Sequence, residues 1–263
     1  MKNTLFVLVL MSLIACKQTS DEKEETNQVK ATAQVAKIYP ENISKVFKAH
    51  GGIDAWNSMN SLEFTIPKEN GNEVTTTDLK NRKSLMDMPN HRIGFDGEHV
   101  WLKNNDTTNY KGNPKFYYNL MFYFYAMPFV LSDEGINYAD VDALEFEDVS
   151  YPGVKIAYES GVGESSEDEY ILYYNPETFK MEWLGYTVTY FSKEKSTQFN
   201  FINYSDLQNV NGLSLPKTLT WYKSENNKPT EKRNAITFTN IKLLKEKLNA
   251  TLFEMPKGAK VID

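Results

Sequence analysis

Apolar and polar residues alternate along most of the chain after residue 60, which is the pattern of strands with one buried face. Leu62, Phe64 and Ile66 alternate with polar residues, and Ile93 and Phe95 repeat the pattern. Roughly a dozen strands are predicted on this basis. They fall at residues 61–67, 72–80, 83–88, 90–95, 98–103, 142–149, 153–160, 168–175, 179–191, 196–206, 213–224 and 232–243.

Tight turns separate these segments. Asp96-Gly97 and Asn211-Gly212 suit two-residue hairpins, because both residue types tolerate a positive φ, and residues 175–178 read Asn-Pro-Glu-Thr. Helical segments do not alternate with the strands, so a parallel nucleotide-binding sheet is not expected. The pattern predicts a mainly β fold in which one meandering antiparallel sheet curves around an interior.

Residues 116–131, FYYNLMFYFYAMPFVL, form a long apolar segment between the predicted strands. The segment holds one amide, Asn119, and Pro128 interrupts it, so it is shorter than the about 20 apolar residues of a membrane-spanning helix. Soluble proteins leave few large apolar patches in water, so this segment must be covered or must cover something else. We predict a helix over residues 116–126 that closes the curved sheet. It either fills the interior as core or lines an apolar pocket, and the sequence leaves both open.

A second helix is predicted before the first strand. Pro40 stands near its first turn, apolar residues such as Ile43 recur on one face, and Gly51 follows its end. His50 lies at the carboxyl end of this helix, where a positive charge would complement the helix dipole.

The first residues have the features of a secretory signal. Lys2 supplies the positive start, residues 5–11 supply an apolar run, and Leu13-Ile14-Ala15-Cys16 resembles a bacterial lipobox. In signals of this kind the chain is cut before the cysteine, which is then acylated. We therefore expect a signal peptide at residues 1–15 and attachment of Cys16 to the membrane through acyl chains. No internal disulfide can form, because the chain has one cysteine.

Residues 16–37 are predicted to be a disordered acidic tether, since they are polar and contain no aromatic residue. Residues 38–263 then form one domain. Lys17 replaces the aspartate that retains many lipoproteins in the inner membrane, which favours the outer membrane of the cell envelope. The sequence does not distinguish the periplasmic face from the cell surface, and it does not fix the oligomeric state.

Charge excludes one class of partner. Without residues 1–15 the chain has 28 basic and 35 acidic residues and a net charge of −7. Three arginines, Arg82, Arg92 and Arg233, in an acidic chain do not make the positive surface that nucleic acid requires. We expect no binding of nucleic acid.

Residues with catalytic or metal-binding chemistry are few. A two-residue turn at Asp96-Gly97 places His91 and His99 on opposite faces of their hairpin, so one metal ion could not bind both, whereas a three-residue loop would place them on one face. The chain shows no Gly-rich phosphate loop, zinc-ligand spacing or Ser-His-Asp candidate. The sequence therefore predicts neither a metal site, nor a cofactor, nor an enzyme.

Four short motifs resemble the LolA/LolB-like lipoprotein-carrier superfamily. They are FDGEHVW at residues 95–101, LYYNPET at 172–178, VNGLSLP at 210–216 and the closing segment at 252–263. The resemblance covers residues 40–263 and implies an incomplete, half-open β-barrel of about 11–12 antiparallel strands, closed by one or two helices. Carriers of this family also rely on an arginine inside the barrel, and none of the arginines here stands in a motif that carries this role over.

The resemblance implies that the concavity binds a lipid or an acylated molecule without catalysis. The alternative is a structural or protein-interaction module of the envelope whose barrel is filled. If a pocket exists, we expect aromatic and aliphatic side chains from the apolar segment and the strands to line it. The expected ligand-binding residues are Trp101, Phe116, Tyr117, Leu120, Met121, Phe124, Trp183 and Tyr190.

Overall fold

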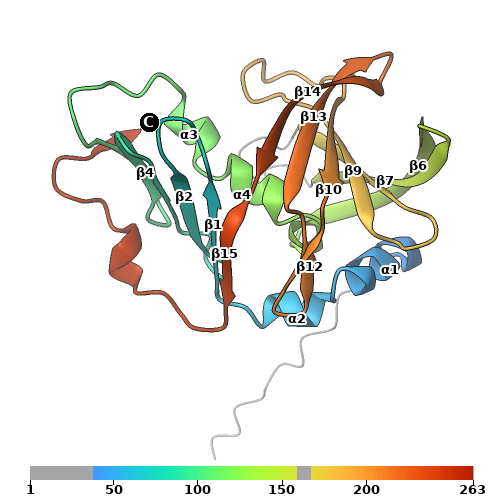
Figure 1. Cartoon of the computed structure of the whole chain (residues 1–263), viewed down its shortest axis with the longest axis horizontal. Coiled ribbons are helices and arrows are strands. Elements are labelled where there is room, and N and C mark those ends of the chain that lie inside the picture. The colour runs from blue at the N-terminus through green and yellow to red at the C-terminus, as the bar shows by residue number, and fades with distance from the viewer. Residues whose placement is uncertain (1–37, 159–166, 263) are drawn as a thin grey trace, which may run out of the picture. The chain divides into compact units, whose positions relative to one another are not determined.

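The alternating segments form antiparallel strands in a computed structural model that describes residues 38–158 and 167–262. The strands build two seven-stranded sheets and a two-stranded ribbon (Figure 1). In spatial order, the first sheet contains β15 (Thr239–Leu244), β1 (Ser61–Ile66), β2 (Glu73–Asp78), β3 (Ser84–Asp87), β4 (His91–Phe95), β5 (Val100–Asn104) and β16 (Lys260–Ile262). The second contains β14 (Lys228–Thr237), β13 (Thr218–Glu225), β10 (Asn200–Ser205), β9 (Met181–Tyr186), β8 (Glu169–Tyr174), β7 (Val149–Tyr158) and β6 (Ile136–Phe146). The ribbon pairs β11 (Gln208–Val210) with β12 (Leu213–Leu215).

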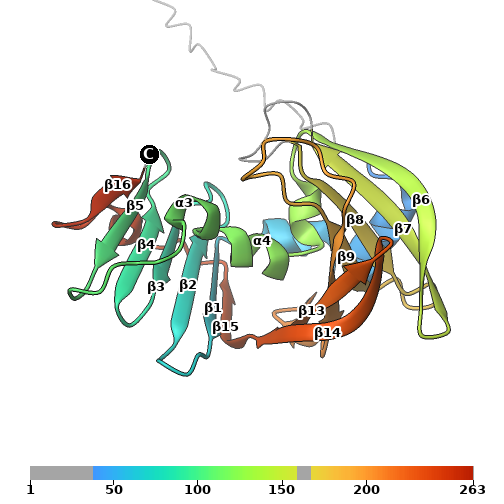
Figure 2. The same ribbon diagram turned by 90° about the horizontal axis from the view of Figure 1, so that it is seen from above.

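The two sheets are joined at Phe238, the single residue between β14 and β15. Its ring is buried and packs against Phe64 of the first sheet, with ring centroids 5.2 Å apart. Both sheets curve and neither closes into a barrel, as the view from above shows (Figure 2). The mainly β, half-open antiparallel architecture predicted from the sequence is thus confirmed.

Most strands are shorter than predicted, whereas β6 and β7 are longer, and the described part of the chain contains sixteen. Pro216 separates β12 from β13 within the predicted strand 213–224, because proline cannot donate to a ladder. The predicted strand 179–191 ends at Tyr186. Two short strands that lack clear alternation, β11 and β16, were not predicted.

The register of the β4–β5 hairpin differs from the prediction by two residues. Phe95 faces Val100 and His91 faces Asn104, so the turn is centred one residue later than expected. A shift of two residues in the pairing leaves every side chain on its predicted face, because strand side chains alternate with period two. His91 and His99 therefore lie on opposite faces, as predicted.

The predicted first helix is α1 (Glu41–Ala49), and the short α2 (Ile53–Asn57) follows it. Ile43, Val46 and Phe47 are buried against the second sheet's core. Gly51 and Gly52 both have positive φ, which allows the chain to turn sharply after α1.

His50 does not act as a charged cap for α1, contrary to the expectation from sequence. The ring is 2% exposed, Nδ1 lies 2.8 Å from the Ser214 carbonyl, and Nε2 accepts a hydrogen bond of 2.9 Å from the Met181 amide. Nδ1 must therefore carry the proton, and the neutral ring joins α1 to β12 and β9. Burial lowers the pKa of His50 to about 4, so desolvation outweighs the helix dipole here.

The prediction of one helix over residues 116–126 is wrong, because the helix is not continuous. The segment forms α3 (Pro114–Tyr117), α4 (Leu120–Tyr125) and the 3₁₀-helix η1 (Phe129–Ser132). Asn119 interrupts it with φ −128° and ψ 0°, and its carbonyl accepts a hydrogen bond from the Tyr123 amide as α4 starts. Asparagine competes for backbone hydrogen bonds, which explains why a break falls at the one amide of the segment. A last 3₁₀-helix, η2 (Ala250–Phe253), precedes β16.

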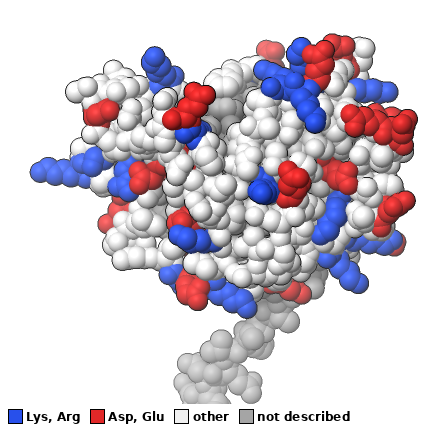
Figure 3. Space-filling view, in the orientation of Figure 1, with Lys and Arg blue, Asp and Glu red and all other residues white. Residues whose placement is uncertain are grey.

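Charged side chains of both signs are interspersed on the face shown in Figure 3. Many of them pair across strands, for example Lys223 with Glu231 at 2.6 Å and Lys242 with Glu63 at 2.6 Å. Water and salt screen exposed pairs of this kind, so they add little to stability. The fold is therefore held mainly by its apolar core, which lies between α1, α4, the inner face of the second sheet and strands β1 and β15 of the first.

Candidate functional site

A cavity of about 480 Å³ lies between the helical segment and the ends of β7 and β8. Phe116, Leu120, Phe124 and Met127 line it from the helical segment. The other lining residues come from the same helical region, from the residues that follow η1, and from the second sheet and its loops. They are Lys115, Tyr118, Asn119, Tyr123, Asp133, Glu134, Tyr158, Asp168, Tyr170 and Tyr190.

The apolar segment both fills the interior and lines this cavity. Phe122 and Tyr125 are almost fully buried in the main core, so α4 is apolar on every side. Leu120 and Tyr123 are only partly buried and face the cavity. The two alternatives left open by the sequence therefore hold for different parts of one segment.

Of the eight expected ligand-binding residues, Phe116, Leu120, Phe124 and Tyr190 come together around the cavity. Phe116 and Tyr190 are in contact, with ring centroids 5.1 Å apart, although 74 residues separate them in the chain. Phe191, which is 67% exposed, lies against the same Phe116 ring and forms part of the rim.

Trp101 lies away from the cavity, which corrects its expected position. Its indole packs over Gly94, where an added Cβ would come within 2.1 Å of Cζ2. Its Nε1 donates a hydrogen bond of 3.1 Å to the Phe253 carbonyl in η2. Alternation along β5 places Trp101 on the face of the first sheet that η2 covers, opposite the face that carries Tyr118.

Trp183 also lies outside the cavity. It packs against Phe146 and Tyr222, with ring centroids 4.7 and 4.8 Å away, in a cluster separate from the main core. Its neighbour Leu184 belongs to the main core. Because consecutive residues of a strand point to opposite faces, Trp183 must occupy the outer face of the second sheet.

Tyr117 and Met121, the remaining two expected residues, stabilise the fold and do not line the cavity. Met121 is 5% exposed within the main core. Tyr117 donates a hydrogen bond of 3.0 Å from its hydroxyl to Glu73, a carboxylate that is 1% exposed and also pairs with Lys68. A buried carboxylate needs such partners, so Tyr117 stabilises the start of β2 instead of lining the cavity.

Tyr158 and Tyr170 supply polar groups that the sequence reasoning missed. Tyr158 ends β7 and Tyr170 lies near the start of β8, and their rings meet edge to face with centroids 5.9 Å apart. Burial raises the pKa of both phenols, and the charge of Asp168 raises that of Tyr170 further. Both hydroxyls therefore stay protonated at neutral pH. Tyr158 and Tyr170 are aromatic residues at the neighbouring ends of two consecutive predicted strands, and this pattern could have identified them.

Asp168 is a carboxylate that lines the cavity beside Tyr170. Its Oδ1 accepts hydrogen bonds from the amide and the hydroxyl of Thr189, at 2.6 and 2.8 Å. Burial raises the pKa of Asp168, while the Thr189 hydrogen bonds oppose this effect. The side chain is thus held in place at the end of β8.

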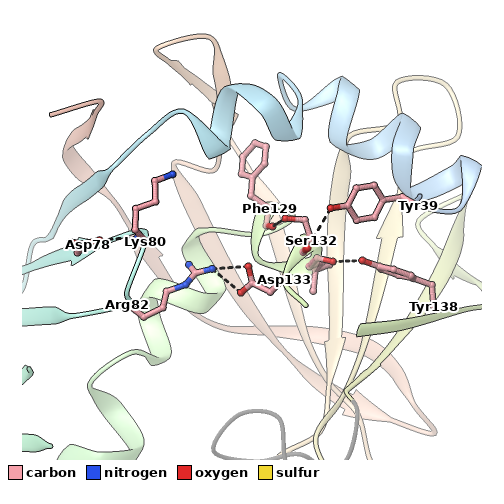
Figure 4. Close-up of polar contacts among 9 residues, drawn as sticks. Tyr39, Asp78, Lys80, Arg82, Phe129, Ser132, Asp133 and Tyr138 are labelled. Atoms are coloured by element: carbon pink, nitrogen blue, oxygen red, sulfur yellow. Dashed lines mark hydrogen bonds and ion pairs between the residues drawn. The ribbon is translucent and has the colours of Figure 1, made fainter. Parts of the chain in front are cut away.

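Arg82 ties the first sheet to the wall of the cavity. Its guanidinium donates two hydrogen bonds of 2.7 Å to Asp133 (Figure 4). It also lies 5.2 Å from the centre of the Phe122 ring in α4. In the same view, Tyr138 donates a hydrogen bond to the Leu131 carbonyl. These contacts anchor the chain after α4 to both sheets. The cavity wall is therefore held by hydrogen bonds as well as by apolar packing.

Tyr204 fixes α4 from the second sheet. Its buried hydroxyl donates a hydrogen bond of 2.9 Å to the Phe124 carbonyl. Phe124 also packs against Tyr186 and Trp221, with ring centroids 5.1 and 6.0 Å away. The inner end of the cavity is therefore rigid and aromatic.

Within residues 38–158 and 167–262, no group of three or more His, Cys, Asp or Glu side chains is placed to hold a metal ion. In the same part of the chain, no helix has the length and apolar character needed to cross a membrane. Cys16, the signal peptide and the tether predicted from the sequence lie outside the described residues.

Comparison with known proteins gives a family and a fold. The model of a family of unknown function, DUF6503, matches residues 63–238. No curated protein matches the chain.

Several solved structures are similar to the chain in fold. A LolA superfamily protein from Nitrosomonas europaea has 9% sequence identity and a TM-score of 0.47, with 77% of this chain and 96% of that chain covered. A DUF1329 family protein from Desulfovibrio piger has 10% identity and a TM-score of 0.49, covering 82% and 98%. An outer membrane lipoprotein-sorting protein domain from Vibrio parahaemolyticus has 6% identity and a TM-score of 0.36, covering 74% and 93%. These similarities concern the fold alone.

Proposed function

The chain belongs to the family of unknown function DUF6503, so its activity has to be inferred from its own geometry, and we propose that it binds a hydrophobic ligand in the cavity beside α4. The ligand is a lipid or an acylated molecule, and binding is non-catalytic. The protein acts at the outer membrane of the cell envelope, where acyl chains on Cys16 attach it.

The observation that carries this proposal is a cavity with an apolar wall beside α4. Its volume of about 480 Å³ falls in the range of small-molecule sites, about 300–1,000 Å³. Leu120, Phe124 and Met127 form an apolar wall, while Tyr158 and Tyr170 provide a few polar groups. An apolar wall with few polar groups is the lining expected for an acyl chain with a polar end.

Rigid support of the wall favours binding over a packing defect. Tyr204 and Arg82 hold α4 and the residues after it from opposite sides. A fixed wall cannot collapse into the cavity, so the space persists without a ligand and little ordering free energy is lost on binding.

Titration with a neutral lipid tests the proposal. The chain from Lys17 onward keeps every described residue, and we expect it to bind monododecanoylglycerol with 1:1 stoichiometry in native mass spectrometry. Leu120→Trp places a larger side chain in the cavity and should abolish binding, whereas Leu252→Trp, at a 38% exposed position on η2, should leave it intact. Absence of binding to the wild type, or equal binding to the Leu120→Trp variant, would overturn the proposal and favour the alternative of a structural module.

A further inference from the structure

The polar end of the cavity combines aromatic rings with carboxylates. The ladder of β7 and β8 sets Ala157 opposite Glu169, and continuing this register by one residue brings Tyr158 opposite Asp168. Tyr170, two residues further along β8, shares the face of Asp168. Two aromatic rings and one carboxylate therefore meet where β7 ends and β8 begins.

The polar atoms of Tyr158, Tyr170 and Asp168 are available to form hydrogen bonds with a ligand. Among the described residues, neither the Tyr158 hydroxyl nor the Tyr170 hydroxyl has a hydrogen-bond partner, although both side chains are largely buried. Thr189 occupies only Oδ1 of Asp168, which leaves Oδ2 without a donor in that part of the chain. Partly buried polar groups of this kind are normally satisfied, so a ligand or solvent must complete them.

The charges around the cavity favour a positive ligand group. Asp133, Glu134 and Asp168 line it against one basic residue, Lys115. Arg82 neutralises Asp133 through two hydrogen bonds, so the charges left around the cavity are Glu134, Asp168 and Lys115, with Lys193 at the rim. Ionised carboxylates accept hydrogen bonds but cannot donate them, so they repel a phosphate or carboxylate head and attract an ammonium group.

An ammonium group of the chain already occupies the rim. Nζ of Lys193 lies 4.3 Å from the centre of the Tyr190 ring, and the same lysine acts electrostatically on Asp168. This is the geometry of a cation–π contact. The side chain is long and exposed, so a ligand ammonium group could displace it at little cost.

We propose that the ligand is a cationic amphiphile, whose alkyl chain lies along Leu120 and Phe124 and whose ammonium head lies among Tyr158, Tyr170 and Asp168. This inference rests on the proposed function, because it names the chemical class of ligand for the same cavity. Ring faces and a carboxylate together stabilise an ammonium group that has lost part of its hydration.

Three amphiphiles with the same chain length separate the head-group preference from binding of the chain. Dodecyltrimethylammonium, monododecanoylglycerol and dodecanoate are titrated below their micelle concentrations into the chain from Lys17 onward, with isothermal titration calorimetry as the readout. We expect the cation to bind at least about fivefold more tightly than the neutral lipid, and the anion to bind most weakly.

Two variants assign the preference to named residues. Asp168→Asn keeps the Thr189 hydrogen bonds possible and should lower the affinity for the cation about five- to tenfold, with little effect on the neutral lipid. Lys193→Ala removes the competing ammonium group and should raise the affinity for the cation. Asp106→Asn, an exposed carboxylate outside the cavity, is the control and should change neither affinity.

The outcomes distinguish the two proposals. Equal binding of the cationic and neutral amphiphiles, or tightest binding of the anion, would overturn the ammonium assignment and leave the lipid cavity in place. Failure of all three amphiphiles to bind would overturn both proposals. A cation preference that persists in Asp168→Asn and does not rise in Lys193→Ala would also overturn the assignment.

Discussion

Lowering the pH from 7 to 4 should remove about 3 kcal/mol of stability through His50 alone. The buried ring donates to the Ser214 carbonyl and accepts from the Met181 amide, so it joins three elements only in its neutral form. Protonation would put a hydrogen on Nε2 where an amide hydrogen already points. It would also place a positive charge in the core.

The magnitude follows from the change in pKa. Folding lowers the pKa of His50 from 6.5 to about 4, mainly through burial and with a further contribution from the charge of Lys180. Because the folded-state pKa is the lower one, the stabilisation is fully present above pH 6.5 and is lost as the pH falls toward 4. The loss reaches about 2 kcal/mol at pH 5 and about 3 kcal/mol at pH 4.

Urea unfolding at several pH values measures this loss. His50→Gln removes the titrating group, so the difference in unfolding free energy between wild type and variant should shrink by about 3 kcal/mol between pH 7 and pH 4. His99→Gln, at an exposed position beside the β4–β5 turn, is the control and should follow the wild type at every pH. A difference between wild type and His50→Gln that does not change with pH would refute the neutral, buried histidine.

Three further substitutions test the support of α4, the packing of Trp101 and the lipid anchor. Tyr204→Phe leaves a buried carbonyl of α4 without its donor and should cost about 1–3 kcal/mol in urea unfolding, whereas Tyr222→Phe, which breaks no hydrogen bond in the described chain, should cost less. Gly94→Ala forces a methyl group into the Trp101 indole and should cost about 1–3 kcal/mol; a neutral effect would contradict that packing. Cys16→Ser should move the protein from the detergent phase to the aqueous phase in phase partitioning, and retention in the detergent phase would refute the lipid anchor.

The fold could be predicted further than the site. Alternation of residues such as Leu62, Phe64 and Ile66 records which face of a strand is buried, and this is a local property of the sequence. The same rule kept His91 and His99 on opposite faces even though the predicted register was shifted by two residues. The break at Asn119 was harder to predict, because this single amide lies within a strongly apolar segment that favours one continuous helix.

The cavity depends on which face each helix covers, and alternation does not contain that information. Trp101 and Trp183 are as aromatic as Phe116 and Tyr190, yet η2 and β6 cover them on the outer faces of their sheets. Tyr158 lies at a strand end opposite the helical segment, and the sequence does not show that these two parts of the chain meet. Pairing between distant segments decides such positions, so they required the three-dimensional structure.

Methyl NMR of the methionines shows whether a lipid binds in the cavity beside α4. Met127 lines the cavity, whereas Met86 lies in a separate cluster of the first sheet and Met59 lies in the core away from the cavity lining. During titration with monododecanoylglycerol, the account predicts a saturable shift of the Met127 methyl resonance and unchanged Met59 and Met86 resonances. Unchanged Met127 with shifts at Met86, or no shift at any methionine at saturating lipid, would contradict it.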